Sequence, residues 1–157
     1  MTIQLQFVCG NAISSRTIAW FSAGHLSHVD AILPDGRLLG ARSDHVGGKP
    51  PGVQVRHPGY AKWVSRIIMT IPTDQTKQDK FYDFLRMQIG KPYDRLAILG
   101  FLFNRDWRDD DSWICSELQA AALEYAGISP SPLYLAANKI TPVACALVCS
   151  ALGAIVN

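Results

Sequence analysis

A tight-turn signal between two strand-like runs is the feature that most constrains the fold of this chain. Pro34, Asp35 and Gly36 separate an apolar run over residues 27–33 from another over residues 37–42. Proline presets the φ angle that a turn needs, and aspartate and glycine are favoured at the other turn positions. The pattern therefore predicts a β-hairpin, in which the second run returns as the antiparallel partner of the first.

Other strand-like segments also lie mostly before the helix-like ones. Apolar–polar alternation or a run of β-branched residues predicts three further strands, over residues 3–9, 52–56 and 62–71. Helical spacing and good helix formers predict four helices, over residues 11–21, 74–88, 96–103 and 116–125. Strands followed by helices are typical of an α+β fold, so we expect an antiparallel sheet packed against helices.

The length and the C-terminal composition set the domain organisation. With 157 residues, the chain suits one domain, which we expect over residues 1–139. Residues 140–156 carry no charge, and Thr141 before Pro142 is the pattern of a capped helix start. We expect an apolar helix over residues 140–157, docked on the domain or on a partner. A membrane segment is the alternative, because the stretch is near the shortest length that spans a bilayer.

Charge and cysteine usage exclude several classes of function. The net charge is +2, and no stretch interleaves basic and aromatic residues, so nucleic acid is not an expected partner. The four cysteines, Cys9, Cys115, Cys145 and Cys149, lack the paired spacing of a disulfide framework or a zinc site. We therefore expect reduced thiols, no metal and no cofactor. Cys145 and Cys149 share a helical face, where core packing is favoured over a soft-metal or iron–sulfur site.

Cys115 is the strongest candidate for a reactive residue. It lies where the helix over residues 116–125 should begin, with Asp111 and Ser112 as candidate N-caps. A thiol in the first helical turn meets unpaired N–H groups and the positive end of the helix dipole, which both favour thiolate. Such a thiolate is a nucleophile if a histidine can reach it, whereas a buried structural cysteine is the alternative.

His28 is the histidine that the pattern places on a strand. Alternation puts His28 and Asp30 on one face of the strand over residues 27–33, with Val29 and Ala31 on the other. A rigidly held imidazole opposite a cysteine at a helix start, with a polar group to orient the ring, is the geometry of a papain-like thiol hydrolase.

Five short segments resemble a known family. Gly90-Lys91-Pro92-Tyr93 and Trp113-Ile114-Cys115-Ser116-Glu117-Leu118 resemble the elements around the nucleophile of NlpC-type cell-wall peptidases. Ser27-His28-Val29 followed by Leu38-Leu39-Gly40-Ala41 resembles that family's histidine hairpin. Because the histidine precedes the cysteine, the order resembles the circularly permuted, YaeF/YiiX-type papain-like amidases. The segment from Ile13 to Phe21 is similar to the helix before the histidine strand in that branch.

The resemblance implies a role for each matching residue. Cys115 would be the nucleophile and His28 the general base and then acid. The hydroxyl of Tyr93 and the backbone N–H of Cys115 would bind the oxyanion, unless Tyr93 only packs under the helix.

Two positions depart from the family pattern. Gly40 stands where the family has its third polar residue, so Asp30 is the expected substitute, with Ser43 and Asp44 as fallbacks. Glu117 replaces a glycine. Its carboxylate either interacts favourably with the positive end of the helix dipole or, together with the acidic residues 109–111, raises the pKa of Cys115.

Three functions agree with these observations. The first is a cysteine hydrolase that cleaves an amide in a peptidoglycan peptide or a related acyl substrate. The second is a non-catalytic papain-like module that contacts phage tail or assembly proteins through the apolar C-terminus. The third is a membrane-associated lipid acyl hydrolase or transferase. The N-terminus shows no signal-peptide pattern, which suits a cytoplasmic or virion-associated protein. A loop containing Arg105, Trp107 and Arg108 either shapes the substrate entrance or is a solvated turn.

Overall fold

The chain folds as an α+β protein, which confirms the predicted class. The computed structural model describes residues 1–10, 25–94, 112–130 and 140–157. Within these ranges it contains a six-stranded antiparallel sheet, in the order β4-β3-β2-β1-β5-β6, and three helices. The helices expected over residues 11–21 and 96–103 lie outside the described residues, as does the loop of residues 104–111.

Five of the six strands follow the predicted segments closely, whereas β6 lies in the segment that was expected to be helical. Their bounds are β1 (Thr2–Gly10), β2 (His28–Ile32), β3 (Leu38–Arg42), β4 (Gly52–Arg56), β5 (Trp63–Pro72) and β6 (Ile155–Val156). The hairpin of β2 and β3 is confirmed: the Leu33 N–H donates to the Arg37 carbonyl at 2.8 Å. Gly36 takes a φ of 81°, which few residues other than glycine adopt at little cost.

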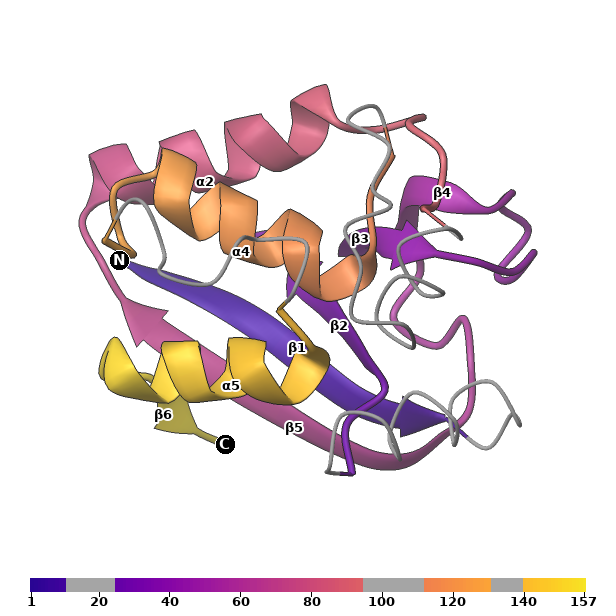
Figure 1. Cartoon of the computed structure of the whole chain (residues 1–157), viewed down its shortest axis with the longest axis horizontal. Helices are drawn as coiled ribbons and strands as arrows, with labels where there is room; N and C mark the ends of the chain where they lie inside the picture. Colours follow the sequence, from indigo (N-terminus) through magenta and orange to yellow (C-terminus); the bar gives the residue numbers. More distant parts are fainter. Residues whose placement is uncertain (11–24, 95–111, 131–139) are drawn as a thin grey trace.

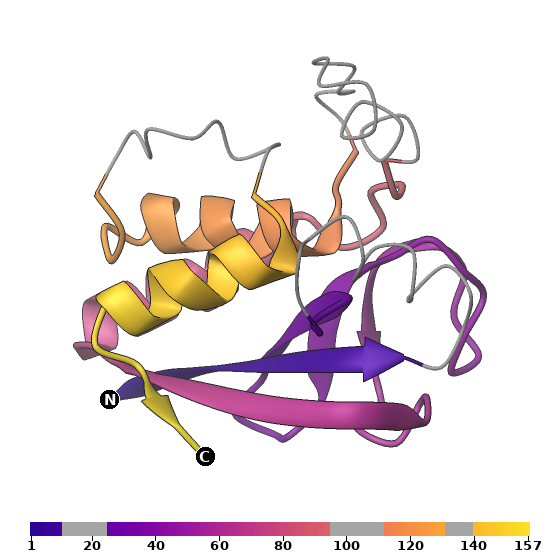
Figure 2. The same ribbon diagram turned by 60° about the horizontal axis from the view of Figure 1, so that its bottom comes forward.

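The three helices cover one face of the sheet. They are α2 (Gln75–Met87), α4 (Cys115–Tyr125) and α5 (Pro142–Ala151). Figures 1 and 2 show all three on the same side of β1 and β5. The side chain of Asp74 caps α2 by accepting the Lys77 N–H, and Phe81 and Leu85 are buried beneath it. Ile89 is 43% exposed because it lies beyond Met87, the last residue of α2.

Strand register separates an apolar face from a polar one. Phe7 pairs with Val29 and Leu5 pairs with Ala31, and these residues form the core beneath the helices. The intervening pairs, Gln6 with Asp30 and Val8 with His28, put polar groups on the other face. Opposed residues of antiparallel strands share a face, so the register gives His28 and Asp30 the common face expected from alternation.

The first half of β5 is exposed, although an apolar, β-branched run such as residues 62–71 is typical of a buried strand. Val64 is 67% exposed, and continuous burial of the inward positions begins only at Met69. The reason is geometric: β5 extends past the end of the helical layer, as Figure 2 shows. Apolar content alone could not reveal how far the covering helices reach.

The C-terminal helix is shorter than expected and is docked on the domain. Cys145 and Cys149 are fully buried in the core, so this face of α5 packs on the domain. The helix ends at Ala151, and a turn through Gly153 leads into β6, which pairs with β5. Among the described residues, no helix is long and apolar enough to cross a membrane.

Candidate active site

Cys115 is the first residue of α4, as the sequence predicted. The N-cap is Ile114 rather than Asp111 or Ser112, and no side chain at the cap position binds the helix N–H groups. Asp111 lies outside the described residues, and Ser112 lies before the cap. The Glu117 carboxylate accepts the Ile114 N–H at 3.4 Å, which is the helix-terminus role considered for it. The positive end of the helix dipole therefore lies at the Cys115 thiol.

The segment from Gly90 to Tyr93 is fixed between β4 and the start of α4. The Val53 N–H donates to the Lys91 carbonyl, and the Gly90 N–H donates to the Val53 carbonyl, both at 2.9 Å. Tyr93 then forms a parallel bridge with Trp113, two residues before Cys115. This arrangement puts Tyr93 near the thiol. Burial and the nearby Cys115 charge hold the pKa of Tyr93 well above its usual value, so its hydroxyl stays protonated.

His28 and Asp30 form a buried pair on β2. The His28 Nε2 lies 2.9 Å from Asp30 Oδ1, and the two residues are 7% and 1% exposed. Asp30 therefore occupies the orienting position for which the sequence offered it as a substitute. Asp44, one of the fallbacks, is bound by Arg42 at 2.7 Å instead, and Ser43 lies beside it in the loop after β3.

Gly40 explains how Asp30 can take this position. A Cβ built on Gly40 would collide with Asp30 Oδ1 and would also press against its carboxyl carbon. The missing polar side chain on β3 thus leaves the space that the Asp30 carboxylate fills. The lack of a side chain at Gly40 and the position of the Asp30 carboxylate therefore depend on each other.

Tyr60 is a site residue that the sequence analysis missed. Its hydroxyl donates to Asp30 Oδ2 at 2.8 Å and lies 3.2 Å from His28 Nε2. Tyr60 comes from the connection between β4 and β5, where a single tyrosine in a turn has no periodicity or motif that could identify it. Only the folded connection brings Tyr60 into contact with His28 and Asp30 on β2.

Aromatic and cationic groups surround the histidine. The Trp63 ring is stacked with the His28 ring at a centroid distance of 6.4 Å and meets Tyr60 edge-on at 5.3 Å. The guanidinium of Arg42 lies over both aromatic rings, 5.4 Å from Tyr60 and 5.6 Å from Trp63. These contacts limit the rotation of the imidazole and screen its bond to Asp30 from water.

The structure brings Cys115 and His28 together, and their pKa values shift in opposite directions. Burial alone would lower the pKa of His28. The charges of Asp30 and Cys115, with hydrogen bonds to both, outweigh burial and raise that pKa from 6.5 to about 9. Burial would likewise raise the pKa of Cys115, but the His28 charge, a His28 hydrogen bond and the Val29 N–H lower it. The directions favour a thiolate–imidazolium pair near neutral pH.

The carboxylate behind the histidine stays ionised. Burial would raise the pKa of Asp30, but the His28 charge and hydrogen bonds from His28 and Tyr60 lower it. A permanent negative charge next to the imidazole stabilises the imidazolium. The set of thiol, imidazole and carboxylate has the parts needed for nucleophilic acyl transfer.

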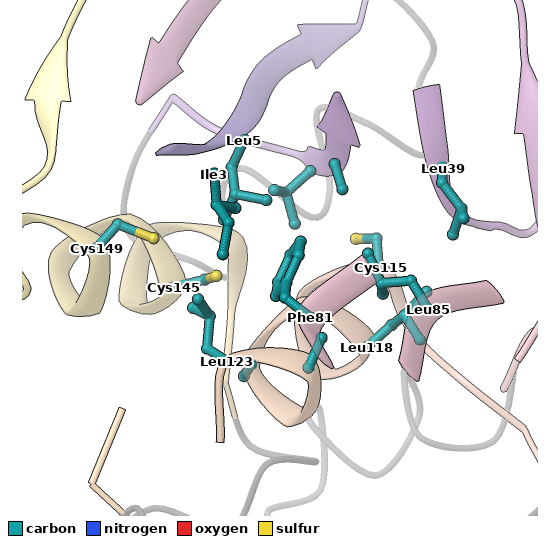
Figure 3. Close-up of a cluster of buried hydrophobic side chains, with 14 of the residues drawn as sticks. Ile3, Leu5, Leu39, Phe81, Leu85, Cys115, Leu118, Leu123, Cys145 and Cys149 are labelled. Atoms are coloured by element: carbon teal, nitrogen blue, oxygen red, sulfur yellow. The ribbon is translucent and has the colours of Figure 1, made fainter. Parts of the chain in front are cut away.

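The other cysteines are not part of this set. Figure 3 shows Cys145 and Cys149 on α5, on the far side of Phe81 from Cys115. The hydrogen bond to Cys149, burial and the negative charges nearby raise the pKa of Cys145 well above its usual value, which makes it an unreactive thiol. The described ranges contain no group of three or more side chains that could hold a metal ion.

Neither a protein-family model nor a curated protein matches this chain.

Proposed function

We propose that this protein is a cysteine hydrolase that cleaves an amide bond through Cys115 and His28. The observation that carries the proposal is the opposed pKa shift of these two neighbouring groups, with an ionised Asp30 behind the histidine. A buried, inert cysteine has its pKa raised, as Cys145 does. A lowered pKa in an equally buried place requires a charge partner, which is the mark of a site prepared for nucleophilic attack.

The fold proposed with this activity is the circularly permuted NlpC-type papain-like fold. Its support is the location of the resembling segments: the hairpin of β2 and β3 carries the histidine, α4 begins at the cysteine, and the segment from Gly90 to Tyr93 lies between β4 and the start of α4. The helices on one face of an antiparallel sheet agree with this assignment.

The reaction would proceed in two acyl transfers. The Cys115 thiolate attacks the carbonyl carbon, and the carbonyl electron pair moves to oxygen as an oxyanion. The oxyanion collapses to a thioester while the His28 imidazolium gives its proton to the leaving amine. A water molecule then attacks the thioester with His28 as base, which releases the acid and restores the thiolate and imidazolium.

Two donors are available for the oxyanion in this scheme. The Cys115 backbone N–H is at the start of α4, where helix N–H groups have no partner within the helix. The Tyr93 hydroxyl, which stays protonated, would be the second. Losing an oxyanion donor lowers kcat roughly 100- to 1000-fold. Tyr93→Phe should therefore lower kcat by up to this factor.

The substrate class follows from the resemblance rather than from the shape of the site. The resemblance implies an amide in a peptidoglycan stem peptide or a related acyl substrate. A lipid acyl hydrolase or transferase would use the same thioester chemistry with a lipid amide or ester. Parallel assays with soluble peptidoglycan fragments and with short-chain acyl amides and esters would separate the two classes.

Selective alkylation tests the proposal without a known substrate. Iodoacetamide at pH 6–7, followed by peptide mass mapping, should modify Cys115 at least tenfold faster than Cys145 or Cys149. Cys115→Ser should abolish both the fast phase and any amide hydrolysis, whereas Cys9→Ser should change neither. Uniform slow labelling of the wild-type thiols would refute the activated cysteine.

A non-catalytic module is the second candidate, and the burial of the pair favours it. Cys115 is 5% exposed, and a catalytic thiol must admit an acyl group. In this case the same groups would stabilise a module that contacts phage tail or assembly proteins. Reaction of Cys115 with iodoacetamide but with no larger acyl reagent or substrate would support this candidate over hydrolysis.

A further inference from the structure

We infer that Tyr60 is a positioning residue that holds Asp30 and selects the ring nitrogen with which His28 faces Cys115. This inference rests on the proposed function, because it concerns the same histidine. It assigns to the connection between β4 and β5 a role that the sequence pattern would place on β3.

The hydrogen-bond directions around the Tyr60 hydroxyl follow from the number of protons that each group can donate. A hydroxyl has one proton, and here Asp30 Oδ2, at 2.8 Å, takes it, because an ionised carboxylate can only accept. Burial and the Asp30 charge raise the pKa of Tyr60, so this proton is retained. The hydroxyl oxygen is then left to accept, and Arg42 Nη1 donates to it at 3.4 Å.

These directions determine the state of the imidazole. The His28 Nε2 lies within reach of two atoms, Asp30 Oδ1 at 2.9 Å and the Tyr60 oxygen at 3.2 Å. Both can act only as acceptors toward it, so Nε2 must carry a proton. The neutral imidazole then keeps its lone pair on Nδ1, and this nitrogen is left to exchange a proton with the Cys115 thiol.

The position of the hydroxyl is itself fixed by packing. The Tyr60 ring meets Trp63 edge-on, and the guanidinium groups of Arg42 and Arg56 lie over its face at 5.4 Å and 5.8 Å. A Cβ on Gly47 would collide with the Tyr60 Cβ, so the loop after β3 closes against the tyrosine. A hydroxyl whose ring is fixed by these contacts can orient the Asp30 carboxylate, since each carboxylate oxygen has one defined partner.

Tyr60→Phe is the direct test, and Tyr82→Phe is its matched control. Tyr82 is a buried tyrosine, and its hydroxyl donates at 2.8 Å to the Ile32 carbonyl at the other end of β2. Each variant keeps its ring and loses one hydroxyl with the hydrogen bond that it donates, and Tyr60→Phe also loses the acceptor of Arg42. The readouts are the rate of Cys115 alkylation against pH and the NMR titration of the His28 ring, with thermal unfolding as a check on folding.

The two variants should differ in their acid limb. Without the Tyr60 hydroxyl, the pKa of Asp30 rises, so the carboxylate is neutralised and the imidazolium loses its partner at a higher pH. We expect the acid limb of Tyr60→Phe to move up by about one pH unit, which is a tenfold slower alkylation on that limb. The Tyr82→Phe profile should overlay the wild type. Equal profiles for both variants, with equal loss of thermal stability, would reduce Tyr60 to a structural residue and overturn the inference.

The wild-type protein supplies a test that needs no variant. Above pH 10, where His28 is neutral, ring ¹⁵N shifts should show the proton on Nε2. A proton on Nδ1 would overturn the inference even if Tyr60→Phe does not fold. Failure of the proposed function looks different: the wild type would hydrolyse no amide and Cys115 would react slowly, while the His28 ring would still show the Nε2 proton and the response to Tyr60→Phe.

Discussion

The Asp30 carboxylate occupies the space that a β-carbon on Gly40 would fill. The two residues face each other on adjacent strands, β2 and β3, and Asp30 reaches His28 only because β3 has no side chain at that point. A glycine that looks like a missing catalytic residue is therefore what admits the orienting carboxylate.

Gly40→Ala should displace the carboxylate. The added methyl group would meet Asp30 Oδ1 and the Val29 carbonyl, so the cost to stability should be about 1–3 kcal/mol, as for other overpacked sites. The pKa of His28 should fall because its nearest negative charge moves away. Gly59→Ala is the control, since its β-carbon would meet no atom within 4 Å. Unfolding in urea and the His28 titration measure both effects, and an unchanged His28 titration in Gly40→Ala would contradict the expectation.

Asp30→Asn should separate the charge of Asp30 from its shape. The amide can still face the ring, but the Asp30 charge that helps to offset burial is lost, so the pKa of His28 should fall from about 9. Without the imidazolium the thiolate loses its partner, and alkylation of Cys115 at pH 7 should slow at least tenfold. Asp83→Asn, which removes an exposed carboxylate paired with Arg86, should have no effect. Equal rates for the two variants would show that Asp30 does not act through the histidine.

The pH dependence should differ between alkylation and hydrolysis. Alkylation needs only the thiolate, so its rate should rise with a midpoint below the ordinary thiol value of 9.0 and then stay high. Amide hydrolysis also needs the imidazolium proton for the leaving amine, so kcat/KM should fall again as pH passes about 9. A single alkylation midpoint at 9 or above would contradict the thiolate–imidazolium pair.

Asp30 should make the free energy of unfolding depend on pH in the acid range. Its folded pKa lies below the unfolded value of 3.8, so its contribution is present above pH 3.8 and is lost as pH falls through the folded value. At pH 7 the wild type should exceed Asp30→Asn by about 3–5 kcal/mol in free energy of unfolding, the usual effect of breaking a buried ion pair. That difference should shrink below pH 3.8. A difference that is constant from pH 7 to pH 3 would show that charge plays no part in it.

Thr141→Ala should loosen the start of α5. The Thr141 hydroxyl accepts the Ala144 N–H at 3.1 Å, and loss of such a cap costs about 1 kcal/mol. Ser150→Ala near the end of the same helix removes an exposed hydroxyl that donates to the Ala146 carbonyl, and it should change stability by less than about 0.5 kcal/mol. Denaturant unfolding of both variants makes the comparison. An equal cost for both would mean that the cap does not hold the helix.

Local signals in the sequence determined the elements of this protein. The turn at Pro34–Gly36, the alternation around His28 and the helix formers after Cys115 identified the hairpin and α4, because hydrogen bonding and side-chain direction in these elements depend on near neighbours. The same local rules put His28 and Asp30 on one face of β2.

Tertiary structure decided the features that those local rules cannot predict. Tyr60 meets Asp30 from thirty residues away, and the free space above Gly40 exists only between paired strands. The reach of the helices over β5 and the return of the C-terminus as β6 depend in the same way on long-range packing, since burial and strand pairing are properties of segments that meet only in the folded chain.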